Sequence, residues 1–139
     1  MAKKHTKGLV LDLGCYVRYY QPFCNGIYVG LDQRIWDQRR PPDLIADAEK
    51  LPLRAHCADT IVAFDIVEHL RNDELFLQEC SRVLKHGGII LITCPSYRSK
   101  DLWSDFTHRR AYNFVTLGLK LTKHGIFPLV SDTIPEKYV

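Results

Sequence analysis

The sequence predicts an α/β fold in which a doubly wound, mostly parallel sheet carries helices between its strands. Four short runs are almost continuously apolar, which is typical of strands buried on both faces of a sheet. A clear helix signal separates the last two runs, and strands that alternate with helices are joined by right-handed crossovers that make them parallel. In such a sheet, ligands bind beyond the carboxyl ends of the strands. The four runs are Gly8–Gly14, Ile27–Asp32, Thr60–Asp65 and Ile89–Cys94.

The bulk composition is that of an ordinary globular domain. The 139 residues are enough for one sheet with its helices, so residues 1–139 are expected to form a single domain. No apolar run approaches the ~20 residues that a membrane span requires, and the basic N-terminus leads into an apolar segment too short for a secretory signal. Five cysteines without a Cys-x-x-Cys pair are typical of reduced thiols in a cytoplasmic protein. A formal charge of +3 is too weak to indicate nucleic-acid binding.

The best-marked helix lies between the third and fourth runs. Asn72 is its expected N-cap, and two carboxylates follow in the first turn, where they suit the helix dipole. Lys85 and His86 are expected in the last turn, with Gly87 as the C-terminal cap.

A second helix is expected over Phe114–His124, between an Asn113 cap and Gly125. The segment Ile126–Asp132 then resembles a final strand. It suits a sheet edge best because Pro128 interrupts it.

Three motifs occur in a characteristic order. They are LVLDLGC at Leu9–Cys15, GLD at Gly30–Asp32 and RVLKHGG at Arg82–Gly88. As an ordered series, they strongly resemble class I S-adenosylmethionine-dependent methyltransferases of the type 11 group. The resemblance covers roughly residues 8 to 130 and implies a Rossmann-like methyltransferase fold, S-adenosylmethionine as cofactor and methyl transfer as the activity.

The resemblance also implies where the cofactor binds. Gly14 after the first strand lets backbone amides approach the methionine part of the cofactor. Asp32 ends the second strand, where its carboxylate can accept both ribose hydroxyls. The segment at Asp47 borders the adenine, and the segment at Asp65 lies beneath the transferring methyl group; taken singly, Asp12 and Asp47 could equally be turn caps. The full expected set is Asp12, Gly14, Cys15, Asp32, Gln33, Asp47, Ala48, Glu49, Asp65, Ile66 and Val67.

One departure from the family pattern bears on function. The usual Gly-Cys-Gly-x-Gly reads Gly14-Cys15-Tyr16-Val17-Arg18 here, so two glycines are missing and Tyr16 could block the approach of the backbone to the ligand. Two hypotheses follow. Tyr16 lines an adapted pocket of an active methyltransferase, or the chain is a degenerate cofactor-binding or scaffold subunit without catalysis of its own.

The acceptor side is indicated by two further segments. A short first connection with aromatic residues and proline, Tyr19–Phe23, and the stretch Asp105–Tyr112 resemble a subset of the family linked to surface-sugar and lipid pathways. The resemblance therefore implies a small-molecule acceptor, such as a sugar or a lipid-linked intermediate. Methyl transfer needs a general base only when the nucleophile is a hydroxyl or similar group, and His69 and His108, with Asp105 nearby, are the candidates. For His69, a capping or packing role is an equal alternative.

Three other interpretations of the function are weaker. Cys94–Tyr97 resembles the motif of amino-methylating nucleic-acid enzymes, but it follows the wrong strand. A nicotinamide-dependent dehydrogenase would need a Gly-x-Gly-x-x-Gly fingerprint that is absent. A metal site can be drawn from Glu68, His69 and His108, yet no short ligand pair anchors it, so no metal is expected.

The family's last strand pair also bears on assembly. Methyltransferases of this class usually insert a seventh strand beside the fifth, and the chain is expected to lack it, together with the N-terminal lid helices. The run Ile89–Cys94 would then expose unpaired backbone groups, unless Ile126–Asp132 pairs with it or another chain covers it. We expect a homodimer or a partner subunit at that edge.

Overall fold

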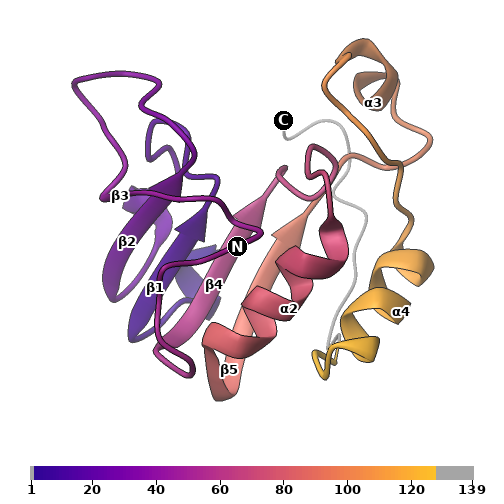
Figure 1. The fold of residues 1–139 in the computed structure, drawn as a ribbon. Coiled ribbons are helices and arrows are strands. Elements are labelled where there is room, and N and C mark those ends of the chain that lie inside the picture. Colours follow the sequence, from indigo (N-terminus) through magenta and orange to yellow (C-terminus); the bar gives the residue numbers. More distant parts are fainter. Residues whose placement is uncertain (1, 128–139) are drawn as a thin grey trace.

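The computed structural model describes residues 2–127, and the strands in this part form one parallel sheet (Figure 1). The strand order is β3-β2-β1-β4-β5, and all strand pairings are parallel. The doubly wound α/β prediction is thus confirmed. The strands are β1 (Leu9–Leu13), β2 (Ile27–Asp32), β3 (Leu44–Ile45), β4 (Ala58–Phe64) and β5 (Leu84–Thr93).

The strand order places a topological switch point between β1 and β4. The chain runs outward from β1 through β2 to β3 and then returns to form β4 on the other side of β1. Crossovers on the two sides of β1 therefore diverge, which leaves room for a ligand beyond the carboxyl ends of β1 and β4.

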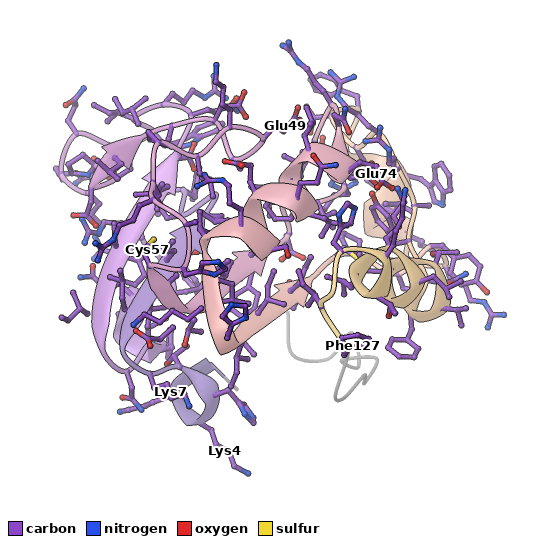
Figure 2. All side chains as sticks on the ribbon, turned by 60° about the horizontal axis from the view of Figure 1, so that its bottom comes forward. Lys4, Lys7, Glu49, Cys57, Glu74 and Phe127 are labelled. Carbon is purple, nitrogen blue, oxygen red and sulfur yellow. The ribbon has the colours of Figure 1, made fainter. Side chains whose placement is uncertain are left out.

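Helix α2 (Asp73–Val83) packs on one face of the sheet, and α4 (Phe114–Lys123) lies beside it (Figure 1). The largest core cluster forms between this face and the helices; among its members are Leu11, Leu13, Leu31, Ile61, Ala63, Phe76, Leu77, Cys80, Val83, Leu117 and Leu121. Glu74 joins the two helices, since its carboxylate binds Lys120 at 2.8 Å, His124 at 2.8 Å and Lys123 at 3.1 Å (Figure 2).

The opposite face is covered by the short connection between β1 and β2. This connection contains only a turn of 3-10 helix, η1 (Gln21–Phe23), where a full crossover helix is usual. Tyr20 packs edge-on against Phe64 of β4 with ring centroids 4.7 Å apart, and the Arg18 guanidinium lies 5.2 Å from the ring centre of Tyr28. Aromatic and arginine side chains thus take the place of a helix on this face.

The first predicted helix ends earlier than expected. Lys85 and His86 lie in β5 rather than in the last helical turn, so that part of the prediction is wrong. The backbone N–H groups of His56 and Cys57 donate to the carbonyls of Arg82 and Val83, at 2.9 and 2.8 Å, and draw the chain into the sheet. Strand pairing here overrides local helix preference.

The second helix is confirmed. Asn113 caps α4 in a reciprocal box with Thr116, and Gly125 follows at φ 74°. Of the expected final strand, Ile126 and Phe127 lie outside any strand, and the remainder falls outside the described residues. Two short helices, α1 (Ala2–His5) and α3 (Lys100–Ser104), were not predicted. Over residues 2–127, every helix is too short or too polar to cross a bilayer.

The position of β5 generates the first prediction. Within the described residues β5 is an edge strand, and its segment 89–94 is half-buried. We expect the amides of this segment that point away from β4 to be protected by a second copy of the chain, by a partner subunit or by a later segment of the same chain. Light scattering over a dilution series, combined with amide hydrogen exchange of residues 89–94, tests this. A stable monomer whose outward amides exchange rapidly would contradict it.

Candidate active site

The ends of β1, β2 and β4 meet at one edge of the sheet, as predicted for the cofactor residues. Gly14 follows β1 at φ 75°, and its N–H donates to the Leu31 carbonyl at 2.9 Å. A Cβ atom at position 14 would lie 2.8 Å from Cδ1 of Ile66, which follows β4. Both the left-handed backbone and the close approach of Ile66 therefore require glycine here.

Asp32, the last residue of β2, has a carboxylate that accepts several hydrogen bonds. Its Oδ2 accepts from the Tyr16 backbone N–H at 2.9 Å, and its Oδ1 accepts from Trp36 Nε1 at 2.9 Å. With only 8% of its surface exposed, Asp32 is held by the two loops that flank the site. The acceptor positions expected to receive ribose hydroxyls are occupied by groups of the chain itself.

Tyr16 and Trp36 form an aromatic pair at Asp32. Their ring centroids are 5.1 Å apart, and the Arg34 guanidinium lies 3.6 Å from the centre of the Trp36 ring. Trp36 is 43% exposed, so its ring is not locked into the core. Tyr16 was singled out from the sequence, whereas Trp36 was missed. Its only signal was an indole N–H donor four residues after the strand-end carboxylate.

Several expected cofactor residues are covered by the fold. Asp12 is 1% exposed and accepts a hydrogen bond from Tyr28 Oη at 2.5 Å. Burial raises the pKa of Asp12 to about 6, although the Tyr28 hydrogen bond partly offsets it. Cys15 and Val67 are buried as well. Any contact of these three residues with a ligand would therefore go through the backbone, and their place in the cofactor site stays a prediction.

The segment after β3 is organised by its own carboxylates. Asp47 Oδ1 accepts from the Glu49 N–H at 2.9 Å, which fits the alternative that Asp47 caps a turn. Glu49 Oε1 accepts from the N–H groups of Arg71 and Asn72, at 2.8 and 3.0 Å, and so fixes the start of α2 (Figure 2). Ala48 is half-buried against the core, and Gln33 is exposed.

Asp65 follows β4 in a strained conformation. Its φ is 51°, in the left-handed region that non-glycine residues rarely adopt. It is held there by Thr93, whose carbonyl accepts from the Asp65 N–H at 3.1 Å and whose hydroxyl donates to Asp65 Oδ1 at 3.1 Å. Strain of this kind is often found at functional sites.

The segment after β5 folds over the end of β4. The Arg109 N–H donates to the Glu68 carbonyl at 2.7 Å, and the Arg110 guanidinium donates to the carbonyls of Leu70 and Arg71, at 2.6 and 2.8 Å. These bonds bring the stretch Asp105–Tyr112 beside Glu68 and His69, which are far away in the sequence.

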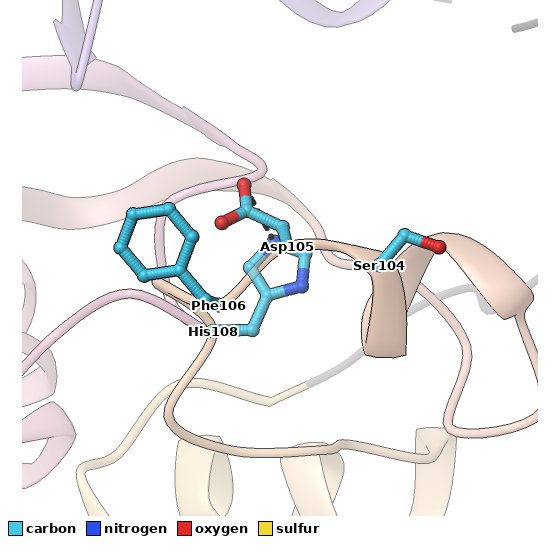
Figure 3. A pocket seen from close by; sticks show the side chains of 4 residues that line it. All are labelled: Ser104, Asp105, Phe106 and His108. Atoms are coloured by element: carbon cyan, nitrogen blue, oxygen red, sulfur yellow. Dashed lines mark ion pairs between the residues drawn. The ribbon is translucent and has the colours of Figure 1, made fainter.

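The structure brings together His69, His108 and Asp105, whose part in catalysis stays a prediction. The two imidazole centroids are 4.6 Å apart, and His108 Nε2 lies 3.8 Å from Asp105 Oδ2. An open surface hollow of about 550 Å³ is lined by Ser104, Asp105, Phe106 and His108 (Figure 3). Burial, with help from neighbouring His108, lowers the pKa of His69, and hydrogen bonds from Thr107 lower the pKa of Asp105.

Glu68 is a buried carboxylate in the same place. It is 1% exposed, and within the described part of the chain neither carboxylate oxygen has a hydrogen-bond partner. Burial raises the pKa of Glu68 to about 7, and the nearby N–H of the same residue offsets this only in part. A buried polar group without a partner requires an explanation.

Comparison with known proteins identifies the family. A family model described as "Methyltransferase domain" matches residues 11–92. The chain belongs to this methyltransferase family. The matched range runs from β1 to the end of β5, so it includes the strand-end residues described above.

Curated relatives of this methyltransferase domain match it over short stretches. The ubiquinone biosynthesis O-methyltransferase of Rattus norvegicus is 49% identical over 45 residues, which are 32% of this chain and 13% of that protein. A probable S-adenosylmethionine-dependent methyltransferase of Mycolicibacterium smegmatis is 40% identical over 47 residues, 34% of this chain and 18% of the relative. The chain therefore spans less than a fifth of the length of these two relatives.

Solved structures agree with the methyltransferase fold. A chain from a complex between the Haloferax volcanii Trm112 methyltransferase activator and a candidate methyltransferase aligns with a TM-score of 0.78 at 17% identity, covering 97% of this chain and 68% of that one. An S-adenosylmethionine-dependent methyltransferase from Archaeoglobus fulgidus aligns with a TM-score of 0.73 at 21% identity, covering 87% and 62%. The Rossmann-like expectation is thus confirmed.

The buried Asp12 generates a prediction about pH and stability. Its pKa is raised from 3.8 to about 6, so the folded methyltransferase domain binds an extra proton between these values, and its stability falls as pH rises through this window. Asp12→Asn should remove this loss, which amounts to about 3 kcal/mol at 1.4 kcal/mol per unit. Denaturant unfolding of both proteins from pH 4 to 7.5 measures it.

The matched control for this prediction is Asp59→Asn. The salt bridge to Lys85 lowers the pKa of Asp59, so its contribution to stability is present at neutral pH and is lost as pH falls. Because that loss occurs below the ordinary Asp pKa of 3.8, Asp59→Asn should leave the pH dependence between pH 4 and 7.5 close to that of the parent protein, whereas Asp12→Asn should flatten it. An unfolding free energy of Asp12→Asn that stays parallel to that of the parent protein across the range would refute the assignment.

Proposed function

We propose that this methyltransferase domain binds S-adenosylmethionine beyond the carboxyl ends of β1, β2 and β4 and transfers its methyl group to a small-molecule acceptor. The observation that carries the proposal is the Asp32 carboxylate, which ends β2 and already accepts N–H donors at 2.9 Å. The family match and the names of the relatives support the cofactor. Resemblance to the sugar- and lipid-pathway subset supports an acceptor of that class.

The residues at Asp32 fit a ribose. The Trp36 Nε1–H donates to Oδ1 as a ribose hydroxyl would, so the indole occupies a donor position that the cofactor requires. Trp36 belongs to an exposed loop without regular structure between β2 and β3. Replacing its hydrogen bond to Asp32 with one from a ribose hydroxyl therefore disrupts no helix or strand. Asp32 would hold the ribose, and Gly14 would let the backbone approach the ligand.

The acceptor would lie on the side of His69, Asp105 and His108, beside the open hollow. The bound cofactor supplies a methyl group that is already electrophilic. The chain therefore has to align the acceptor and exclude water from it rather than activate the methyl. The imidazoles of His69 and His108 can act on an acceptor hydroxyl in two ways. They can accept its proton, or they can hold a cation that binds its oxygen.

A second candidate function is a subunit that binds the cofactor only with a partner. Two observations favour it. Tyr16 and Trp36 engage Asp32 in the chain by itself, and the structural neighbour from Haloferax volcanii was solved with a methyltransferase activator. In this view the partner would displace the aromatic pair.

The ribose assignment predicts a loss of affinity in Asp32→Ala. Removing hydrogen bonds to a charged group should weaken S-adenosylmethionine binding by about 1.5–3 kcal/mol, or about 10- to 150-fold, measured by calorimetric titration. Asp37→Ala is the matched control, because Asp37 lies on the same loop and pairs with Arg39 instead. Equal affinity of the Asp32→Ala and Asp37→Ala variants would remove Asp32 from the site.

The aromatic pair gives a prediction that separates the two functions. If the chain is a complete methyltransferase, Trp36→Phe should bind the cofactor about fivefold more tightly, since one competing hydrogen bond of about 1 kcal/mol is lost. Tyr16→Gly should then leave the affinity unchanged or reduced. A clear gain of affinity in Tyr16→Gly would instead favour the degenerate subunit. Where cofactor binding is followed by tryptophan fluorescence, Trp103→Phe is the control, since Trp36 and Trp103 are the two tryptophans of the chain.

A further inference from the structure

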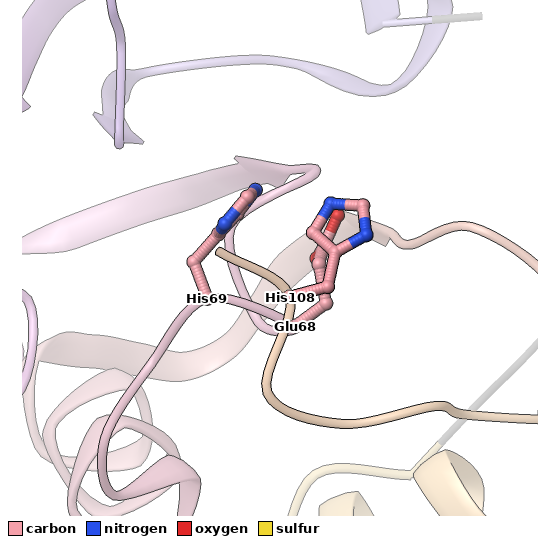
Figure 4. Close-up of side chains that lie close together, drawn as sticks. All are labelled: Glu68, His69 and His108. Carbon is pink, nitrogen blue, oxygen red and sulfur yellow. The ribbon is translucent and has the colours of Figure 1, made fainter. Parts of the chain in front are cut away.

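Three metal-ligating side chains converge where the segment after β5 crosses the end of β4. Each of Glu68, His69 and His108 offers one ligand atom, and these atoms all lie within 4.8 Å of one another (Figure 4). Glu68 and His69 are neighbours in the chain, and hydrogen bonds from Arg109 and Arg110 bring His108 to them. The sequence argued against a metal site because no short ligand pair anchors one, but the fold supplies the missing proximity.

Glu68 is the second, independent observation. A carboxylate that is 1% exposed and has no hydrogen-bond partner in the described chain is costly, because burial removes water without replacing it. His69 and His108 lie beside it but offer no hydrogen bond to it. A cation would supply the missing partner for the carboxylate.

Both imidazoles are held in the tautomer that metal binding needs. His108 Nδ1 lies 2.8 Å from the Leu102 carbonyl, which can only accept, so Nδ1 carries a proton; in the neutral ring, Nε2, which faces Asp105 Oδ2 at 3.8 Å, then has the lone pair. The Thr107 hydroxyl donates to Asp105 at 2.6 Å, so its oxygen accepts from His69 Nδ1 at 2.9 Å. Metal-binding histidines typically donate the N–H of their other ring nitrogen to an acceptor that fixes the ring. The Leu102 carbonyl and the carboxylate-linked Thr107 hydroxyl take that place here.

We propose that Glu68, His69 and His108 bind a divalent transition-metal ion of the Zn²⁺ class, through Nε2 of each histidine and the carboxylate of Glu68. Two histidines and one glutamate form a known zinc donor set that leaves a fourth position open. Zinc–ligand bonds of about 2.0–2.2 Å place the donor atoms of a tetrahedral site about 3.3 Å apart. The two ligand atoms that lie farthest apart therefore have to approach each other by about 1.5 Å. His69 and His108 lie on loops, where rotation of the side chains achieves this.

The open position suggests what the ion does, and this step rests on the proposed function. His108 lines the hollow proposed for the acceptor, so the ion would bind an oxygen donor of the acceptor there. A bound cation lowers the pKa of a hydroxyl, which then loses its proton to water without a general base. The two imidazoles would thus be ligands, and the acceptor class would be a molecule that presents a hydroxyl oxygen.

The test measures metal binding without cofactor or acceptor. The full chain, treated with a chelator and dialysed, is titrated with Zn²⁺ by calorimetry and with Co²⁺ by visible absorption. We expect one ion per chain, a tetrahedral Co²⁺ spectrum and no comparable binding of Mg²⁺, which prefers oxygen ligands. Long-range ¹H–¹⁵N spectra should show Zn²⁺ shifting Nε2 rather than Nδ1 of His69 and His108.

Four variants define the site. Glu68→Gln and His108→Ala should abolish one-to-one binding, and Thr107→Val, which removes an outer partner, should weaken it by about 10- to 100-fold. His86→Ala is the matched control, because His86 stacks on His56 at 4.7 Å in a histidine pair outside the proposed site. Zn²⁺ should raise the melting temperature of the parent protein and of His86→Ala but not of Glu68→Gln, whose fold circular dichroism verifies.

Zn²⁺ binding that persists in Glu68→Gln or disappears in His86→Ala would overturn the proposal, as would a Mg²⁺ affinity equal to that for Zn²⁺. A separate titration of the metal-free protein with S-adenosylmethionine keeps the two proposals apart. Metal binding without cofactor binding would contradict the proposed function and support the metal site. Cofactor binding without metal binding would contradict the metal site and support the proposed function.

Discussion

The cluster of Glu68, His69 and His108 depends on one buried carboxylate, Asp73 at the start of α2. Its Oδ2 accepts from Tyr112 Oη at 2.5 Å and from Lys120 Nζ at 2.8 Å. Burial alone would raise the pKa of Asp73, but these hydrogen bonds and the charge of Arg110 outweigh it and lower the pKa. The first turn of α2 also favours a carboxylate through the helix dipole. Asp73 therefore ties α2, α4 and the segment after β5 to one point.

That attachment explains why loop residues can form a defined cluster. Tyr112 fixes the end of the stretch that begins at Asp105, and Arg110 binds the carbonyls of the loop after β4. His108 is thereby held against Glu68 and His69 from both directions. The cluster is formed by loop residues, but its geometry is set by a buried hydrogen bond and a helix terminus.

More of the fold than of the site could be predicted from the sequence. Apolar runs fix strands buried on both faces, and the caps at Asn72 and Asn113 mark helix starts, because both signals are local. The end of α2 could not be predicted, since Lys85 and His86 suit a helix terminus and only pairing with β4 places them in β5. The side-chain surroundings of Asp12 and Glu68 were equally hidden, because burial depends on which segments pack over them.

The site residues divide along the same line. The family resemblance implied that His69, His108 and Asp105 share one region, and the structure brings them together. Trp36 was missed because its role is a single hydrogen bond across a loop, which leaves no periodic or spaced signal in the sequence. The sequence allowed a metal site to be drawn from Glu68, His69 and His108 but gave no reason to expect one, because only the fold brings His108 to the other two residues.

The two halves of the site differ in how they satisfy their polar groups. Beyond the end of β2, Asp32 already accepts hydrogen bonds from Tyr16 and Trp36, so a ligand there has to compete with hydrogen bonds that the chain itself makes. Beyond the end of β4, Glu68 is buried and neither of its carboxylate oxygens has a hydrogen-bond partner within the described residues, so a ligand there gains interactions without displacing one from Glu68. A ligand at Asp32 therefore has to displace existing hydrogen bonds, whereas a cation at Glu68 needs only the side chains of His69 and His108 to turn toward it, so the two parts of the site carry different conformational costs.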